Sequence, residues 1–206
     1  MLIGFTGLHA AGKSYFLNRL SERFGFKVYD KKQILRRLYF QETGKTDEKF
    51  NLWYGDKFQE DPYAILERIL SFIPEDEDAI LDAIHSSYEW EIIEDLRPES
   101  YLALMVTPRE LREIRWTQRE INPSIDLTSH DNKRLVYWHN QHAERSCLPA
   151  HASWAFCGAA TEELNVKSFG EFLNYIKNKE EINKPENVQK LVKKREQDGW
   201  LLHYSK

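Results

Sequence analysis

The chain has 206 residues, of which 41% are hydrophobic and 13% aromatic, enough for one domain with a buried core; this composition excludes a disordered chain. Its formal net charge of −4 provides no electrostatic basis for binding nucleic acid or an anionic membrane surface. No apolar run has transmembrane length, and the first residues predict a strand rather than a signal peptide. Two cysteines are too few for a disulfide scaffold, so we expect a reducing, cytoplasmic location.

A strand, a glycine-containing loop and a helix are predicted at the start of the chain. Leu2–Thr6 is typical of a short buried strand, and Lys13–Phe24 of an amphipathic helix. The residues between them fit the P-loop pattern G-x-x-x-x-G-K-[ST], and we expect the whole motif to bind nucleotide: Gly7, Leu8, His9, Ala10, Ala11, Gly12, Lys13 and Ser14. In such a loop, backbone N–H groups surround phosphate oxygens, the lysine reaches the β- and γ-phosphates, and the hydroxyl holds Mg²⁺. An accidental match in a turn is the alternative, but the strand–loop–helix order favours a nucleoside triphosphate site.

Helical and extended patterns alternate along the rest of the chain, which predicts an α/β fold with a mainly parallel sheet. Further strands are expected at Lys27–Tyr29, Ala79–Asp82, Tyr101–Val106 and Glu163–Val166. Further helices are expected at Lys32–Glu42, Asp61–Phe72, Tyr88–Asp95, Pro108–Arg119, Asp131–Arg145 and Ser168–Lys177. Gly25 is the predicted C-cap of the first helix, and Ser168 the predicted N-cap of the last.

Two stretches interrupt this alternation. Residues 121–161 are polar, poorly periodic and rich in His and Trp, which is typical of a mobile flap over a site. Residues 178–184 are charged and precede Pro185, as in a linker, and a short amphipathic helix is expected at 186–198. We therefore predict a C-terminal appendage at 178–206, either docked on the domain or free to bind a partner.

The motifs that accompany a P-loop distinguish its classes. A GTPase needs a D-x-x-G switch and an N-K-x-D guanine-binding motif, but Asn132–Leu135 lacks the final aspartate and no D-x-x-G follows the third predicted strand. The chain is also short for a transporter ATPase or an AAA protein. A small nucleotide kinase remains, with ATP as the expected donor and GTP left open as the alternative.

Four polar residues could serve phosphoryl transfer, which depends mainly on positioning and charge neutralisation. Asp82 ends a buried strand, where its carboxylate could hold a Mg²⁺-bound water or position an acceptor hydroxyl. Arg115 and Arg119 are four residues apart on one helix face, so both could neutralise the transferring group or form a solvated face. Arg36 could hold the acceptor's phosphate or sugar, or lie on the surface.

Residues 2–176 resemble P-loop nucleotide kinases of the dephospho-coenzyme A kinase group, in particular its archaeal dCMP-kinase-like relatives and the kinase-like domains attached to dCMP deaminases. The resemblance is carried by Ile3–Ser14, Gly25–Asp30 with Ile34 and Arg36, Ile80–Ser86, Arg115 with Arg119, and Asn165 with Ser168 and Phe169. It implies a three-layer α/β/α P-loop NTPase fold over residues 1–177, with five parallel strands in the order 2-3-1-4-5. It also implies an acceptor lobe at about 31–72, a lid at about 120–160, and acceptor binding by Asp30, Arg36 and His85.

Three positions depart from the family pattern. Asp30 matches the first acid of the family's Asp-x-Asp, but Lys32 occupies the second, so Asp30 could act as the base or the acceptor could be a monophosphate that needs little base. Ala83 and His85 replace the glycine and arginine of D-G-x-R-S; His85 could bind the acceptor, while the next helix could simply be capped by a serine. A nucleotide-binding sensor with weak turnover, or an adaptor of the same fold, is therefore the alternative function.

The sequence thus predicts ATP- and Mg²⁺-dependent phosphoryl transfer to a small nucleotide, with dCMP or another monophosphate ahead of dephospho-coenzyme A. Lys13, Asp82, Arg115 and Arg119 are the predicted catalytic residues, and Ser14 and Asp82 the predicted Mg²⁺ ligands. A structural Zn²⁺ site is a less favoured prediction, since the spacing of its candidate ligands is irregular: His139, His142, Cys147, His151 and Cys157. The aromatic cluster of the acceptor lobe could stack on a base or form core: Phe50, Trp53, Tyr54, Phe58 and Tyr63. The oligomeric state is left open.

Overall fold

The computed structural model describes residues 1–118, 126–138 and 147–182. Contacts divide the chain into two units, Met1–Asn165 and Val166–Lys206, whereas the sequence predicted a boundary after residue 177. The described part of the second unit is helical, and its Phe169 and Phe172 rings meet edge to face with centroids 6.1 Å apart. Within the described residues, no helix combines the length and the apolar character that crossing a membrane requires.

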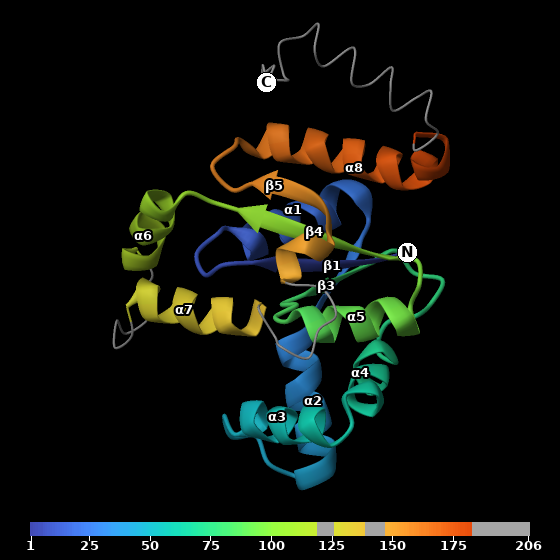
Figure 1. Cartoon of the computed structure of the whole chain (residues 1–206), viewed down its shortest axis with the longest axis vertical. Helices are drawn as coiled ribbons and strands as arrows, with labels where there is room; N and C mark the ends of the chain where they lie inside the picture. The colour runs from blue at the N-terminus through green and yellow to red at the C-terminus, as the bar shows by residue number, and fades with distance from the viewer. Residues whose placement is uncertain (119–125, 139–146, 183–206) are drawn as a thin grey trace, which may run out of the picture. The chain divides into compact units, whose positions relative to one another are not determined.

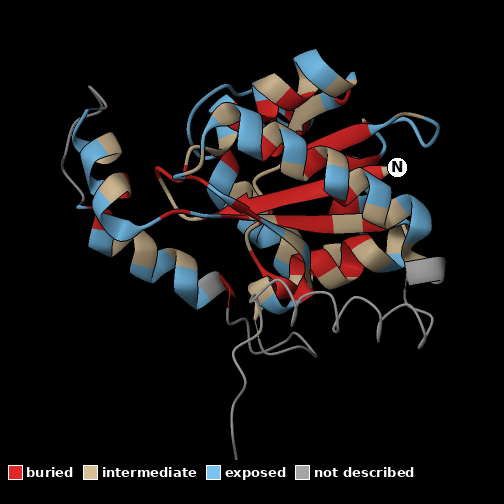
Figure 2. Ribbon diagram, turned by 90° about the horizontal axis from the view of Figure 1, so that it is seen from above, coloured by how far each residue is buried: buried red, intermediate tan, exposed pale blue. Residues whose placement is uncertain are grey.

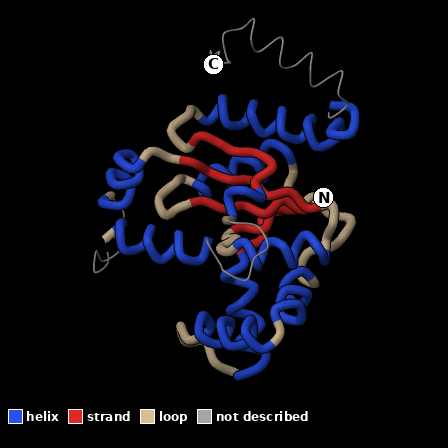
Figure 3. Tube along the Cα trace, in the orientation of Figure 1, coloured by secondary structure: helices blue, strands red, loops and turns tan. Residues whose placement is uncertain are grey.

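A parallel five-stranded sheet forms the centre of the first unit, and its order, β2-β3-β1-β4-β5, is the predicted one. The strands are β1 (Leu2–Gly7), β2 (Lys27–Asp30), β3 (Ala79–Asp82), β4 (Ser100–Val106) and β5 (Ala152–Cys157). Figure 2 shows the sheet between helices on both sides, with its central strands β3, β1 and β4 mostly buried, and Figure 3 shows the strands side by side. Because all five run in one direction, the loops after their carboxyl ends share one edge, where ligands bind in such folds.

Most predicted helices are present. They are α1 (Lys13–Phe24), α2 (Lys31–Thr43), α3 (Phe50–Glu60), α4 (Pro62–Leu70), α5 (Ser87–Leu96), α6 (Arg109–Thr117), α7 (Leu127–Trp138) and α8 (Glu162–Ile182), with a 3₁₀ turn at Leu148–His151. The bounds of α1 match the prediction, and Gly25 is its C-cap with a φ of 75°. The ends of α2, α4, α5 and α6 differ from the predicted ends by at most two residues.

The predicted fifth strand, Glu163–Val166, is wrong. These residues belong to α8, so Ser168 lies inside a helix and caps none. The fifth strand is Ala152–Cys157, within the stretch predicted as a flap. It pairs with β4 at the edge of the sheet. Its residues are apolar except Ser153, but they lie in a stretch whose polar, His-rich neighbours were interpreted as a flap.

Helices α2, α3 and α4 pack on one another and form a lobe beside the sheet (Figure 1). One hydrophobic core joins the lobe to the sheet, since Ile34, Phe50 and Leu66 belong to the same buried cluster as Leu81. Asp61 caps α4 by accepting the N–H of Ala64 at 3.0 Å. Helix α3 was not predicted. Phe50 is its one buried residue, and Gly55 near its middle is a poor helix former.

Candidate functional site

The P-loop connects β1 to α1 in a conformation that its glycines permit. Gly12 is the N-cap of α1 with a φ of 97°, and Ala10 also lies in the left-handed region with a φ of 59°. A Cβ on Gly7 would lie 2.8 Å from the carbonyl oxygen of Met105 in β4, so the neighbouring strand excludes a side chain there. Lys13 and Ser14 open α1, where the first N–H groups have no partner within the helix. A lysine at a helix N-terminus thus lies at the carboxyl end of β1, as phosphate binding requires.

Arg115 of α6 holds the P-loop backbone. Its Nη1 donates to the carbonyl oxygen of Ala11 at 3.0 Å, and its Nη2 to that of Gly158 at 2.8 Å. The Thr107 hydroxyl donates to the same Ala11 oxygen at 2.8 Å, and a Cβ on Gly158 would lie 1.9 Å from that hydroxyl. The predicted arginine therefore lies beside the P-loop, where it bonds backbone carbonyls; Arg119 lies outside the described residues.

A second arginine of α6 connects the P-loop to α7. Arg112 is 4% exposed, and its Nη1 lies 2.8 Å from each carboxylate oxygen of Asp131 in α7. The same nitrogen donates to the His9 carbonyl at 3.4 Å, and Nε donates to the Thr107 carbonyl at 3.3 Å. The rings of His9 and His130 then meet with centroids 4.7 Å apart. Helix α7 is thereby fixed beside the phosphate-binding loop.

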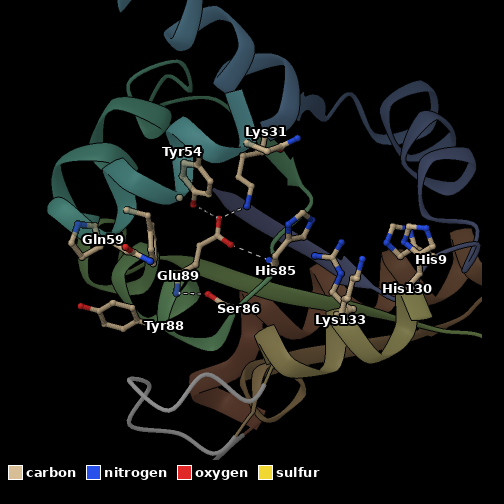
Figure 4. Close-up of a pocket in the computed structure, with 15 residues that line it drawn as sticks. His9, Lys31, Tyr54, Gln59, His85, Ser86, Tyr88, Glu89, His130 and Lys133 are labelled. Carbon is tan, nitrogen blue, oxygen red and sulfur yellow. Dashed lines mark hydrogen bonds and ion pairs between the residues drawn. The ribbon is translucent and has the colours of Figure 1, made fainter. Parts of the chain in front are cut away.

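A cavity of about 940 Å³ begins at the P-loop and extends into the lobe. In Figure 4, His9 and His130 lie at one end, Gln59 and Tyr88 at the other, and His85 between them. The lining residues come from the P-loop, the start of α2, one face of α3, the β3–α5 connection, α5 and α7. Most of the charged ones are basic, and Glu89 is the acidic side chain among them.

Lys31 and Glu89 form a buried ion pair in the cavity wall, with each side chain 3% exposed. The other carboxylate oxygen of Glu89 accepts the backbone N–H of His85 at 3.0 Å. Burial lowers the pKa of Lys31, and the charge and hydrogen bond of Glu89 oppose that effect. Burial also raises the pKa of Tyr54 well above its usual value, so this hydroxyl stays protonated beside Glu89.

His85, a predicted acceptor-binding residue, lines this cavity. Burial lowers its pKa well below the usual 6.5, and the positive charges of Lys31 and Arg134 add to the effect. At pH 7 the imidazole is therefore neutral, with one nitrogen able to donate a hydrogen bond and the other able to accept one.

Two carboxylates lie side by side at the ends of β2 and β3. Asp30 pairs in register with Asp82, which pairs on its other side with Phe5 of β1. Asp30 caps α2 by accepting the N–H of Lys32 at 2.8 Å, and Asp82 accepts the N–H of Ala83 at 2.7 Å. Hydroxyl and carboxylate oxygens are the ligand type that Mg²⁺ prefers. Asp82 ends β3 and Ser14 lies at the start of α1, after the neighbouring strand β1, and their role as Mg²⁺ ligands stays a prediction.

Arg36 is not brought to the cavity. It is exposed, its guanidinium donates to Glu48 at 2.6 Å, and it lies 4.9 Å from the centroid of the Phe50 ring. The reason is where each residue lies on α2. Lys31 is the first residue of the helix, directly after β2, whereas Arg36 lies on a face that contacts α3 and the segment preceding α3.

The described candidate zinc ligands do not form a metal site either. His151 precedes β5 and Cys157 ends it, so they are roughly 20 Å apart along the strand and cannot share one ion. The ring nitrogens of His151 instead lie 3.5 Å from Glu91 and 3.4 Å from Glu94. No metal-binding group of His, Cys, Asp and Glu occurs in the described ranges, and His139 and His142 fall outside them.

Most of the cavity wall was not predicted from the sequence. Lys31, Glu89 and the three basic residues of α7 (His130, Lys133 and Arg134) were not predicted as site residues. The Ser86-x-x-Glu89 spacing is a capping-box pattern, which accounts for Glu89 without a site. The aromatic cluster divides: Tyr54 and Phe58 line the cavity, whereas Phe50 is buried core.

The strand order, the P-loop and the covering helices together define the P-loop NTPase fold. Neither a protein-family model nor a curated protein matches the chain. Solved structures do. An unliganded sugar kinase from Janibacter sp. HTCC2649 is 11% identical with a TM-score of 0.57, covering 84% of this chain and 94% of its own.

Two further solved structures have the same fold. A gluconokinase from Sinorhizobium meliloti 1021 is 14% identical with a TM-score of 0.53, covering 88% of this chain and 97% of its own. Shikimate kinase from Aquifex aeolicus is 16% identical with a TM-score of 0.50, covering 85% and 97%. At this identity the likeness establishes the fold. The dephospho-coenzyme A kinase group is not among these neighbours, so that finer resemblance stays a prediction.

Proposed function

We propose that the protein is a kinase that transfers the γ-phosphoryl group of ATP to a small anionic acceptor in the 940 Å³ cavity. The observation that carries the proposal is that His9, a P-loop residue, also lines this cavity. An acceptor bound there would therefore lie next to the donor phosphates, which is the positioning that phosphoryl transfer needs. Solved structures with the same fold include a sugar kinase, a gluconokinase and a shikimate kinase.

The cavity favours an acceptor with an anion at one end and a flat ring at the other. Basic side chains gather toward the P-loop, among them His130 and Lys133. Aromatic rings and side-chain amides also line the cavity. Gln59 and Tyr88 lie at the end far from His9, and the others are Asn51, Tyr54 and Phe58. A nucleoside monophosphate such as dCMP matches both ends, since its base can stack and form hydrogen bonds. Dephospho-coenzyme A is the second candidate.

Each part of the site has a defined task in this proposal. The P-loop N–H groups and Lys13 hold the donor phosphates. Ser14 and Asp82 hold Mg²⁺, which neutralises phosphate charge when bound. The basic residues of α7 face the acceptor's anion, and neutral His85 offers it a hydrogen bond.

The test is coupled ADP release with ATP and Mg²⁺ against a panel of acceptors. The panel contains nucleoside and deoxynucleoside monophosphates, dephospho-coenzyme A, shikimate and gluconate. Strong stimulation by one compound would establish the kinase and name its acceptor. ATP binding without stimulation by any of them would contradict the kinase proposal and favour a nucleotide sensor.

The role of Asp82 is tested separately with Asp82→Asn. We expect turnover to fall by about 100-fold or more while ATP affinity changes little, because a ligand of the metal acts mainly on the transition state. The readouts are kcat from ADP release and Kd from ATP titration. Equal, small effects on both constants would remove Asp82 from the mechanism.

A further inference from the structure

Lys31 has more hydrogen-bond donors than the described structure provides acceptors for. It is the first residue of α2, and 2% of its surface is exposed. Its ammonium group has three N–H donors, and Glu89 is its hydrogen-bond acceptor among the described residues. The Tyr54 ring lies 5.6 Å from Nζ and adds a cation–π contact. A buried charge with donors to spare is costly unless another oxygen reaches it.

Glu89 is fixed firmly enough to hold that ammonium in place. One carboxylate oxygen accepts from Lys31 and lies 3.5 Å from the Tyr54 hydroxyl, and the other accepts the His85 N–H at 3.0 Å. Its own backbone N–H donates to the Ser86 hydroxyl at 3.1 Å. Figure 4 shows Lys31, Tyr54 and His85 converging on this carboxylate inside the cavity. The contacts come from α2, α3 and the start of α5, so Glu89 cannot move without disturbing three elements.

The surroundings of this pair attract anions. Glu89 is the acidic residue among the described lining residues, and its charge is already offset by Lys31. The remaining charged groups in the lining are basic, including Lys133 and Arg134 of α7. A phosphate or carboxylate oxygen entering the cavity would thus supply the acceptor that the Lys31 ammonium lacks.

We propose that Lys31 binds an anionic oxygen of the acceptor and that Glu89 is the positioning residue that keeps the Lys31 ammonium charged and aimed into the cavity. The identity of the acceptor rests on the proposed function. The anion site itself does not, because it is defined by the ion pair and the basic wall around it.

The experiment is calorimetric titration of the full chain saturated with ADP, so that the P-loop is already occupied. The probes are dCMP, inorganic phosphate and shikimate, which separate a nucleotide phosphate, a free phosphate and a carboxylate. We expect the wild type to bind at least one probe, and Lys31→Met to weaken it roughly ten-fold or more, the size expected for a charge-assisted hydrogen bond. ADP affinity should stay unchanged.

Lys32→Met is the matched control. Lys32 is the next residue, it is exposed, its ammonium lies 5.8 Å from the Phe50 ring, and it does not line the cavity. The same substitution there should leave the affinity for every probe unchanged. If Lys31→Met leaves Glu89 unpaired and fails to fold, the neutral pair Lys31→Met/Glu89→Gln removes both charges and should bind ADP but not the probe.

Glu89→Gln tests positioning through its pH dependence. The charged and titratable groups around Lys31 are Glu89 and Asp82, which raise its pKa, Arg134, which lowers it, and the hydroxyl of Tyr54 and imidazole of His85. Without the Glu89 charge the ammonium should lose its proton at lower pH. As the pH rises, the variant should therefore lose probe affinity relative to the wild type. The titration of the phosphate probe is the same in both experiments and does not affect this ratio.

The experiments distinguish a failure of the proposed anion site from a failure of the proposed kinase activity. Equal probe affinity of Lys31→Met and wild type, or no binding of any probe to the wild type, overturns the Lys31 proposal. A pH-independent affinity ratio for Glu89→Gln overturns its positioning role. Probe binding that depends on Lys31, without turnover of any acceptor, would keep the anion site and reject the kinase.

Discussion

Two regions beside the P-loop contain a buried cation, and their hydrogen bonds differ. On the α6 side, Arg112 donates to four acceptors within the fold, namely both carboxylate oxygens of Asp131 and two backbone carbonyls. On the α2 side, the ammonium of Lys31 has Glu89 as its acceptor among the described residues, and it lies in a cavity wall. The first arrangement stabilises the loop, whereas the second leaves donors for a ligand. Arg112 and Lys31 are similarly buried, so the number of hydrogen-bond acceptors around each one distinguishes a residue that stabilises the fold from one that binds a ligand.

The largest effect is expected for Lys13→Ala. This variant removes the P-loop lysine, and neither Arg112 nor Lys31 can take over its contact with the ATP phosphates. ATP affinity or turnover should fall by about 100-fold or more, since a buried charge-assisted contact to phosphate is lost. Lys27→Ala is the control, because that side chain is 60% exposed and pairs with Glu77 on the surface. Unchanged affinity and rate in Lys13→Ala would contradict both the kinase and the nucleotide-sensor interpretation.

The loop-stabilising role of the α6 side is also tested at its second arginine, with Arg115→Ala. If Arg115 stabilises the loop, ATP affinity should fall by roughly ten-fold and the free energy of unfolding by about 1–3 kcal/mol, because the Ala11 and Gly158 carbonyls each lose a donor. Arg109→Ala on the same helix is the matched control, since Arg109 is exposed and pairs with Glu113. A large loss of kcat at unchanged ATP affinity and stability would instead support the predicted role in neutralising the transferring group.

A smaller effect, confined to the acceptor, is expected at Gly55. Gly55 lies within α3 in the cavity lining, and a Cβ there would meet nothing within 4 Å. Gly55→Leu should therefore narrow the cavity and raise the acceptor KM about ten-fold without changing ADP affinity. Gly55→Ala, the control, should raise the free energy of unfolding by about 0.5–1 kcal/mol through helix propensity. Equal acceptor KM values in both variants would place the acceptor away from α3.

The smallest effect is a pH dependence of stability at His85. Because the folded-state pKa lies well below the usual 6.5, the unfolded chain binds this proton more readily as the pH falls through 6.5. The free energy of unfolding should then decrease toward acid by at most about 1.4 kcal/mol per pH unit from this residue. His85→Gln should have a shallower slope in chemical denaturation between about pH 7 and pH 5. Parallel slopes for the two proteins would refute the buried, neutral imidazole.

The parts of the fold that were predicted correctly are those determined by local patterns. The P-loop motif and the apolar residues around it predicted β1 and α1, and an apolar run predicted β3. The strand order followed from the resemblance to P-loop kinases. β5 and α3 were missed. β5 lies in a stretch whose polar neighbours indicated a flap, and α3 contains Gly55, a poor helix former. The same limit applied to the site, where Lys31 follows the predicted Asp30 directly and was still missed.

By itself the sequence determined the nucleotide end of the protein. Gly7, Gly12, Lys13 and Ser14 are adjacent in the chain, so their spacing alone specifies how a strand turns into a helix around phosphate. Tertiary structure alone decided the acceptor end. Lys31 and Glu89 are 58 residues apart, and their pairing depends on β2 and β3 lying side by side and on the packing of the lobe. Burial then shifts the pKa values of Lys31, Tyr54 and His85, because desolvation acts only once the chain has folded around them.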